Sequence, residues 1–214
     1  MDCCRSPAAE ANRFFSWFAR RSRRHYQNKG FGKSQRQLIR GIEAQRVIDG
    51  ASVLEVGCGV GYLHQFLLEQ GADRAVGVDL SQRMLDEARD LAKQRRLDEK
   101  TDYRLGDFVE LKDSLPDADV TVLDKVVCCY PDAETLVDAS LDKTRRVYAL
   151  TYPRLHLVNH ILTAVEAAAL RIIRCRFRPY MHDPAEIERL ILARGFLKSF
   201  EERTWIWLTQ VYAR

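Results

Sequence analysis

The sequence lacks the features that mark several common classes of protein. Its six cysteines form no C-x-x-C pair, so a structural zinc site is not indicated and no metal is expected. Residues 1–7 contain no apolar segment of the kind found in secretory signals, which favours a cytoplasmic protein with free thiols. The apolar run from Leu155 to Ile173 is interrupted by histidine, asparagine, glutamate and arginine, and this polarity argues against a membrane span.

The overall composition is typical of a globular protein, but the charge is unevenly distributed along the chain. Hydrophobic residues make up 46% of the 214 positions and charged residues 30%, which favours one folded domain. Residues 1–50 hold 11 Lys+Arg and 4 Asp+Glu, a net charge of +7, whereas the remaining 164 residues have a net charge of −3. The basic character therefore belongs to the N-terminal segment, where it indicates a solvated helix, an anionic partner or a membrane surface.

From residue 51 the apolar pattern alternates between short strands and helices. Strands are expected at 51–56, 74–79, 101–107, 119–124 and 145–152, with intervening helices at 60–70, 81–95 and 133–142. This rhythm predicts an α/β fold with a doubly wound, mostly parallel sheet. Upstream we expect helices at 13–24 and 34–48, separated by a break at 28–33, with Ser34 as the cap of the second helix.

Beyond residue 153 the alternation stops. A long helix at 156–174 is expected as an insert, and a second helix at 184–194 begins with Asp183 as its cap and Pro184 in its first turn. The two β-rich runs at 196–204 and 205–213 are close enough to pair as an antiparallel hairpin at the edge of the sheet.

The run VLEVGCGVGYL at 53–63 carries the strongest functional signal. Its glycines follow the spacing G-x-G-x-G, whereas the dinucleotide fingerprint places a third glycine where Tyr62 stands. No G-K-[ST] follows, which excludes a phosphate-binding P-loop. Glu55 would repel a pyrophosphate but would attract an ammonium group. S-adenosylmethionine fits this turn because it carries an α-ammonium and a sulfonium but no phosphate.

Two further carboxylates follow the next two predicted strands. Asp79 ends the strand at 74–79, where a carboxylate can accept hydrogen bonds from both ribose hydroxyls. Asp107 follows the third strand and could receive the amino group of adenine. Because the carboxyl ends of parallel strands share one edge of a sheet, Glu55, Asp79 and Asp107 are expected to converge on one crevice.

The segments VLEVGCGVGYL, VGVDLS, YRLGDF and DVTVLDKVVCCYPD, taken in order, resemble the motifs of class I S-adenosylmethionine-dependent methyltransferases. The resemblance covers residues 51–152 and the closing hairpin at 196–214. It implies a seven-stranded sheet whose last strand is antiparallel, with 51–214 as the methyltransferase domain and 1–50 as a helical cap belonging to it. It also implies a cofactor site formed by Glu55, Gly57, Cys58, Gly59, Gly61, Asp79, Leu80, Met84, Asp107, Phe108, Asp124 and Lys125.

The sequence restricts the class of methyl acceptor mainly by excluding known types. Enzymes that methylate nucleobase amines carry an Asn/Asp-Pro-Pro-aromatic run after strand four, which this chain lacks. No proline precedes Cys128 and Cys129, as it would in cytosine C5 enzymes, so both are interpreted as small buried residues. The region after strand five faintly resembles magnesium-protoporphyrin O-methyltransferases. The resemblance favours a small, partly apolar acceptor that is methylated on oxygen.

Residue roles on the acceptor side stay open at this point. The catalytic candidates are His156, His182 and Tyr130. Acceptor contacts are expected from Tyr26, Phe31, Tyr130, Tyr152 and Arg154.

The basic run at 13–31 has three interpretations: a lid over the site, an amphipathic helix on an anionic membrane, or a nucleic-acid contact. The alternative function is therefore an RNA or protein methyltransferase recruited by this segment, although a nucleic-acid partner is disfavoured. A binding module without activity is the third possibility, against which the intact cofactor motifs argue. The sequence leaves the oligomeric state open.

Overall fold

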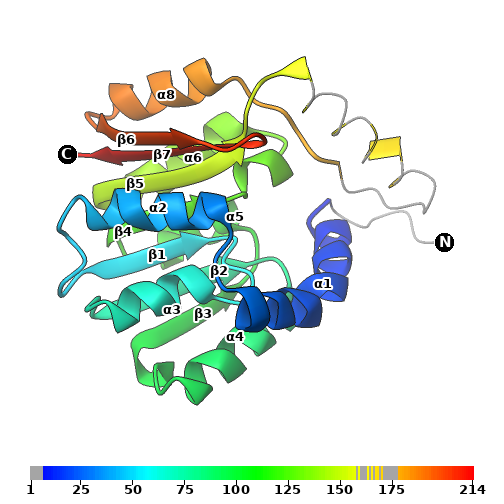
Figure 1. The fold of residues 1–214 in the computed structure, drawn as a ribbon, viewed down its shortest axis with the longest axis vertical. Helices are drawn as coiled ribbons and strands as arrows, with labels where there is room; N and C mark the ends of the chain where they lie inside the picture. The colour runs from blue at the N-terminus through cyan, green and yellow to red at the C-terminus, as the bar shows by residue number, and fades with distance from the viewer. Residues whose placement is uncertain are drawn as a thin grey trace.

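The structure is a computed structural model that describes residues 7–157, 159, 163, 165, 167, 168, 170 and 178–214, with side chains from Phe18 onward. Seven strands form one sheet in the order β3-β2-β1-β4-β5-β7-β6 (Figure 1). The first five strands are parallel, and β7 runs antiparallel to both β5 and β6. This confirms the predicted fold class. The strands are β1 Ser52–Val56, β2 Arg74–Asp79, β3 Thr101–Leu105, β4 Ala118–Asp124, β5 Thr144–Pro153, β6 Leu197–Arg203 and β7 Trp207–Ala213.

Helices cover both faces of the sheet, as its nearly continuous apolar strands require. All five residues of β1 are buried, and successive side chains point to opposite faces. Val53 packs in the core beneath α2 (Lys33–Glu43), α3 (Tyr62–Glu69) and α4 (Gln82–Gln94). Leu54 packs in the core on the other face, beneath α5 (Phe108–Leu111), α6 (Ala133–Asp142) and α8 (Pro184–Ala193). The first helix, α1 (Pro7–Lys29), packs against α4.

Caps fix several helix starts, and one predicted cap is wrong. Ser81 accepts a hydrogen bond from the backbone N–H of Met84 and caps α4, while Asp183 caps α8 as expected. Ser34, however, lies inside α2 and is buried. The cap of α2 is Gly32, whose N–H donates to Oε1 of Gln35 at 3.1 Å. The Gln35 side chain thus satisfies the N–H of the cap residue, whereas a capping serine hydroxyl would have accepted from an N–H inside the first turn.

Two element boundaries also differ from the sequence prediction. Helix α1 extends to Lys29, so the break before α2 is narrower than the predicted 28–33. Strand β3 stops at Leu105 rather than residue 107, because Gly106 turns the chain with φ +146° and Asp107 caps the short helix α5. Most of the helix expected at 156–174 lies outside the described residues. The assignment of residues 1–50 as a cap stays a prediction.

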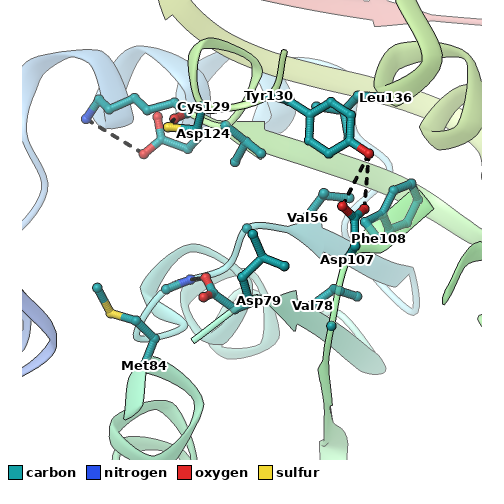
Figure 2. Close-up of a pocket in the computed structure, with 16 residues that line it drawn as sticks. Val56, Val78, Asp79, Met84, Asp107, Phe108, Asp124, Cys129, Tyr130 and Leu136 are labelled. Carbon is teal, nitrogen blue, oxygen red and sulfur yellow. Dashed lines mark hydrogen bonds and ion pairs between the residues drawn. The ribbon is translucent and has the colours of Figure 1, made fainter. Parts of the chain in front are cut away.

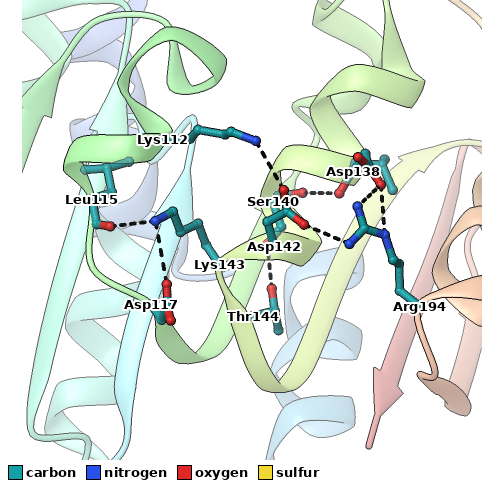
Figure 3. Close-up of polar contacts among 10 residues, drawn as sticks. Lys112, Leu115, Asp117, Asp138, Ser140, Asp142, Lys143, Thr144 and Arg194 are labelled. Atoms are coloured by element: carbon teal, nitrogen blue, oxygen red, sulfur yellow. Dashed lines mark hydrogen bonds and ion pairs between the residues drawn. The ribbon is translucent and has the colours of Figure 1, made fainter.

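The amino-terminal side of the sheet is held by charged contacts between α6 and α8 (Figure 3). Arg194, just after α8, donates through Nε to Asp138 at 3.0 Å and through Nη1 to Asp142 at 2.8 Å. Lys112 donates to the other oxygen of Asp142 at 3.1 Å. These residues lie where β5 begins, at the edge opposite the glycine turn. No helix among the described residues is both long and apolar enough to cross a bilayer.

Candidate cofactor pocket at the carboxyl edge of the sheet

The turns that follow β1, β2, β3 and β4 surround one pocket (Figure 2). These strands are neighbours in the sheet, and the order reverses between β1 and β4, which is where ligands bind in open α/β sheets. The structure brings nine of the twelve predicted cofactor residues to this pocket, and they are Gly57, Gly59, Asp79, Leu80, Met84, Asp107, Phe108, Asp124 and Lys125.

The three glycines of the turn are required for different local reasons, because a side chain at each position would meet different surroundings. Gly57, Gly59 and Gly61 all have positive φ, at +63°, +53° and +78°, a region that other residues rarely adopt. A Cβ on Gly57 would lie 2.5 Å from Cγ2 of Val126, and a Cβ on Gly61 would lie 2.8 Å from Cε1 of His64. A Cβ on Gly59 would meet no atom within 4 Å. Only Gly59 therefore leaves open space above the turn.

Asp79 receives two backbone hydrogen bonds where β2 ends. Its Oδ2 accepts from the N–H of Gly59 and its Oδ1 from the N–H of Ser81, each at 2.8 Å. Burial raises the pKa of Asp79 to about 6, although both backbone bonds oppose this shift. The carboxylate is therefore ionised at neutral pH, and each oxygen keeps a lone pair for a ligand hydroxyl.

Asp107 and Tyr130 meet at the far end of the pocket (Figure 2). Asp107 accepts from the N–H of Val109 at 2.9 Å and caps α5. The hydroxyl of Tyr130 lies 3.2 Å and 3.3 Å from the two oxygens of Asp107. Burial and the charge of Asp107 raise the pKa of Tyr130 to about 12, so the phenol is a donor at neutral pH.

Asp124 and Lys125 lie at the end of β4, on the wall between the pocket and α2. Oδ2 of Asp124 accepts from Nε2 of Gln35 at 2.9 Å and lies 3.8 Å from Nζ of Lys125. Its Oδ1 is buried without a hydrogen-bond partner among the described residues. Nζ of Lys125 also lies 5.2 Å from the centre of the Trp207 ring. A buried acceptor without a partner points to a donor on a bound molecule.

A second, more polar cavity opens between the glycine turn and α1. It shares Gly57, Gly59, Met84, Asp124 and Lys125 with the first pocket, and it adds two predicted cofactor residues, Glu55 and Cys58. Cys58 is buried, and burial followed by the charges of Asp79 and Glu55 raises the pKa of its thiol. Its thiol is therefore protonated rather than nucleophilic at neutral pH.

Helix α1 forms the outer wall of this second cavity through residues that include Arg21, His25 and Tyr26. The ring of Tyr26 stacks on Tyr62 of α3, with centroids 3.5 Å apart. Arg23 donates to Glu87 of α4 at 2.8 Å, and both side chains are only 17% exposed. These contacts hold α1 beside the glycine turn, and its role as a lid stays a prediction.

Several predicted site residues lie elsewhere. Gly61 lines neither of the two cavities, because its missing side chain makes room for His64. Phe31 packs edge-on against Tyr26 and Phe66 rather than facing a cavity. Tyr152 is 1% exposed, and its hydroxyl donates to Gln210 at 2.7 Å inside the core. The acceptor contacts expected from Phe31 and Tyr152 are therefore not supported by their positions.

Three of the remaining predicted acceptor and catalytic residues, Arg154, His156 and His182, are held by backbone carbonyl groups. Arg154 donates to the carbonyl of Thr204 at 3.0 Å. Nε2 of His156 lies 2.9 Å from the carbonyl of Trp205, and Nε2 of His182 lies 2.9 Å from that of Tyr130. Of these, neither Arg154 nor either histidine lines the two cavities, and only Tyr130 borders the first pocket.

Several polar residues that no sequence motif indicated also belong to the site. Gln35 and His64 contact the predicted carboxylates Asp124 and Glu55 directly. Arg21 and His25 are four positions apart, so they share one face of α1, and this spacing is a signal that the sequence does contain. No group of three His, Cys, Asp or Glu side chains able to hold a metal ion occurs among the described residues.

The residues present fit S-adenosylmethionine better than a nucleotide that carries phosphates. The first pocket has three carboxylates, Asp79, Asp107 and Asp124, and one cation, Lys125. Carboxylates accept hydrogen bonds from hydroxyl, amino and ammonium groups but repel phosphate oxygens. Gly59 leaves open space, and Oδ1 of Asp124 lacks a donor within the described residues. This donor set suits a positively charged nucleoside derivative.

Comparisons with known proteins agree with this geometry. Residues 53–151 match the family described as methyltransferase domain. The structure is similar to magnesium protoporphyrin IX methyltransferase from Synechocystis PCC 6803 with bound SAH, with a TM-score of 0.74, 20% identity and coverage of 98% of this chain and 100% of that one. It is also similar to 1,6-didemethyltoxoflavin-N1-methyltransferase from Burkholderia thailandensis, with a TM-score of 0.69, 19% identity and coverage of 99% and 91%.

Curated relatives match over shorter segments. A ubiquinone biosynthesis O-methyltransferase of Coxiella burnetii is 31% identical over 96 residues, which are 45% of this chain and 40% of that protein. A cypemycin N-terminal methyltransferase of a Streptomyces species is 38% identical over 74 residues, 35% of this chain and 28% of that protein. The matches therefore span less than half the length of these relatives. The family match covers slightly less than half of the chain and the solved structures share its fold, so the chain is similar to class I S-adenosylmethionine-dependent methyltransferases.

Proposed function

We propose that this protein transfers a methyl group from S-adenosylmethionine to a small, partly apolar molecule, and that the methylated atom is oxygen. The observation that carries the proposal is the convergence of Asp79, Asp107 and Asp124 on one pocket beside Gly59. The second cavity supports it, because it shares a wall with this pocket and is closed by aromatic and basic residues of α1.

The proposed roles follow from hydrogen-bonding chemistry. Asp79 would accept the two ribose hydroxyls, and Asp107 would accept the adenine amino group. Apolar contacts to the base would come from Leu80, Met84 and Phe108. The cofactor supplies a methyl group already activated by its sulfonium. The protein then has to orient the acceptor and exclude water, and most of its contribution is positional.

Oxygen as the acceptor atom is supported by the match to an O-methyltransferase over 45% of the chain. It is tested by the lability of the product. With labelled donor, a methyl ester releases its label in mild base and a methyl ether releases it as methyl iodide in boiling hydriodic acid, whereas a methylamine keeps it under both conditions. Label recovered only as methylamine would overturn the proposal for oxygen and leave the methyltransferase assignment intact.

One observation favours the alternative of an RNA or protein acceptor. Arg21, Arg24 and Lys29 are exposed on α1, and residues 11–42 contain no Asp or Glu. The variant that tests this alternative is Arg24→Glu. It reverses one exposed charge on α1, and Arg24 does not line the cavity that adjoins the glycine turn. Labelled methyl that enters RNA or protein, and that falls at least about tenfold in Arg24→Glu, would favour the alternative. Transfer to small molecules that is unchanged in the variant supports the leading proposal.

The decisive experiment is calorimetric titration with S-adenosylhomocysteine, with NADH as the control ligand. Micromolar affinity for the first and none for the second is expected. Asp79→Ala should abolish binding without unfolding the protein, because it removes a buried charge and leaves the surrounding apolar packing intact. Normal binding by this variant would show that the ribose lies elsewhere, and binding of NADH alone would overturn the assignment.

A further inference from the structure

Glu55 is held by a residue that no sequence motif singled out. It belongs to β1, is 4% exposed, and contributes to the second cavity. Its Oε2 accepts two hydrogen bonds from His64, one from the backbone N–H at 3.1 Å and one from Nδ1 at 2.6 Å. Oε1 has no hydrogen-bond partner within the part of the chain that the structure describes. One oxygen is thus fixed by His64 while the other remains for a ligand.

The imidazole of His64 is fixed from its other side as well. Its Nε2 lies 3.0 Å from the hydroxyl of Tyr103, which also accepts from Nε2 of Gln65 at 2.9 Å. His64 and Gln65 are both fully buried. Donation from Nδ1 to Glu55 and acceptance at Nε2 from Tyr103 together define one tautomer of the ring. Glu55, His64 and Tyr103 therefore form a continuous buried chain from β1 through α3 to β3.

The backbone around the ring is shaped to accommodate it. A Cβ on Gly61 would lie 2.8 Å from Cε1 of His64, and a Cβ on Gly77 would lie 3.2 Å from the same atom. Gly77 is also the residue that pairs with Glu55 in the sheet. The third glycine of the G-x-G-x-G turn thus contacts the imidazole rather than either cavity. Gly61 and Tyr103 thus contact the imidazole directly, whereas Gly77 makes room for Cys58 as well and Gln65 acts only through the Tyr103 hydroxyl.

We propose that His64 is a positioning residue that aims the Glu55 carboxylate at the α-ammonium group of the cofactor. The inference rests on the proposed function and deepens it by assigning the amino-acid half of the site. Replacing the His64 side chain would leave Glu55 with only the backbone N–H of residue 64 as a donor, so its carboxylate would rotate or lose its fixed distance from the ligand. Asp79 and Asp107, which would bind the adenosine half, take their hydrogen bonds from other residues and not from His64.

The test compares two ligands that differ only in the part that Glu55 would contact. S-adenosylhomocysteine carries the amino acid, whereas 5′-methylthioadenosine has the same adenosine and thioether without it. His64→Leu should weaken binding of S-adenosylhomocysteine by about tenfold or more, because a hydrogen bond to a charged group is lost. Its affinity for 5′-methylthioadenosine should stay within about twofold of that of the wild type.

Three further variants keep the test independent of folding. His64→Asn places an amide near Nδ1, and it should restore most of the affinity for S-adenosylhomocysteine. Tyr103→Phe removes only the outer hydrogen bond, and it should produce a smaller loss of the same selective kind. Leu67→Ala alters the buried face of the same helix without touching the hydrogen-bonded chain from Glu55 to Tyr103, so it should weaken neither ligand selectively.

The outcomes separate this inference from the proposed function. Equal losses for both ligands in His64→Leu and Tyr103→Phe would overturn the positioning role, since a structural defect affects both halves of the site. Unchanged binding of S-adenosylhomocysteine in His64→Leu would overturn it too. Failure of the wild type to bind either ligand would instead overturn the proposed function, and the role of His64 with it.

Discussion

Tyr130 and Asp107 close one end of the pocket from two different strand–helix connections. The tyrosine hydroxyl lies within 3.3 Å of both carboxylate oxygens, although the two residues are 23 positions apart in the chain. Because Asp107 also caps α5, the contact links the wall after β4 to the short helix after β3. The carboxylate is therefore already oriented before any adenine amino group reaches it.

Replacing Tyr130 with phenylalanine should weaken S-adenosylhomocysteine binding by about fivefold, because one of two supports for Asp107 is lost. The pKa of Tyr130 is raised to about 12, first by burial and then by the Asp107 charge. The phenol therefore stays a donor from pH 6 to pH 9, and calorimetry should give the same ratio of wild-type to variant affinity throughout. A ratio that changes within this range would show that another group mediates the effect.

Affinity for S-adenosylhomocysteine should fall as the pH drops from 7 to 5. Burial raises the folded-state pKa of Asp79 to about 6, so the carboxylate protonates in this window and becomes a poorer acceptor for ribose hydroxyls. A loss of about tenfold by pH 5 is expected. Residue 79 cannot titrate in Asp79→Asn, so the affinity of this variant for S-adenosylhomocysteine should not change between pH 7 and pH 5. A slope that persists in this variant would assign the titration to another group.

The same shift predicts a dependence of stability on pH. The folded pKa of Asp79 lies above the ordinary aspartate value of 3.8, so the folded protein binds more protons than the unfolded chain between about pH 4 and pH 6. The contribution of Asp79 to the free energy of unfolding is therefore greatest below pH 4 and falls as the pH rises to 6. Urea unfolding should show that the free energy of unfolding of the wild type, relative to that of Asp79→Asn, falls from pH 4 to pH 6 and is constant above pH 6. A wild-type contribution that increased over this range would contradict the sign.

The glycine turn offers a pair of matched substitutions. Gly57→Ala places a Cβ 2.5 Å from Val126 at a positive φ, so it should lower the free energy of unfolding by about 3 kcal/mol. Gly59→Ala meets no protein atom, so only its backbone strain of about 1 kcal/mol should appear in urea unfolding. Its new methyl group occupies the open space above the turn, and it should reduce S-adenosylhomocysteine affinity by at least about tenfold.

The control for this pair is the double variant Gly57→Ala/Val126→Ala, which removes the clashing methyl groups. It should recover part of the stability lost in Gly57→Ala. If Gly59→Ala bound the ligand normally, the space above the turn would not belong to the cofactor site. Equal destabilisation by both single variants would show that backbone strain outweighs side-chain contact at this turn.

The sequence predicted the sheet well because its signals are local. The run ASVLEV reads as a strand covered on both faces, and Ser81 and Asp183 cap the helices that follow them. The failures have non-local causes. Gly32 rather than Ser34 caps α2, and Gln35, which accepts from the N–H of Gly32, binds Asp124 through Nε2, 89 positions away. No pattern within a short window indicates a partner so distant in the chain.

The candidate site was predictable in part for the same reason. Carboxylates at the ends of parallel strands must share an edge, so Asp79 and Asp107 meet in one pocket. The inward orientation of Tyr152 depends on which face of β5 packs against α6 and α8, and sequence alone did not resolve this. His64 is identified only by its contact with Glu55, which requires α3 to be packed against β1.

The final prediction concerns His182, which the sequence offered as a catalytic base. Its Nε2 lies 2.9 Å from the carbonyl of Tyr130 and so carries the hydrogen, and the N–H of Tyr180 donates to the carbonyl of Cys128 at 2.8 Å. The segment from Tyr180 to His182 therefore supports the wall that carries Tyr130. His182→Ala should raise the KM for the cofactor by about threefold, because this wall loosens, and leave kcat within about twofold.

Steady-state kinetics with an acceptor in excess separates the two roles of His182. A base acts in the chemical step, so its loss should lower kcat by about a hundredfold or more with KM little changed. His182→Asn retains a donor for the Tyr130 carbonyl, and it should restore KM if the role is support of the wall. A fall in kcat that asparagine does not repair would instead make His182 the base, reached by movement of the segment it belongs to.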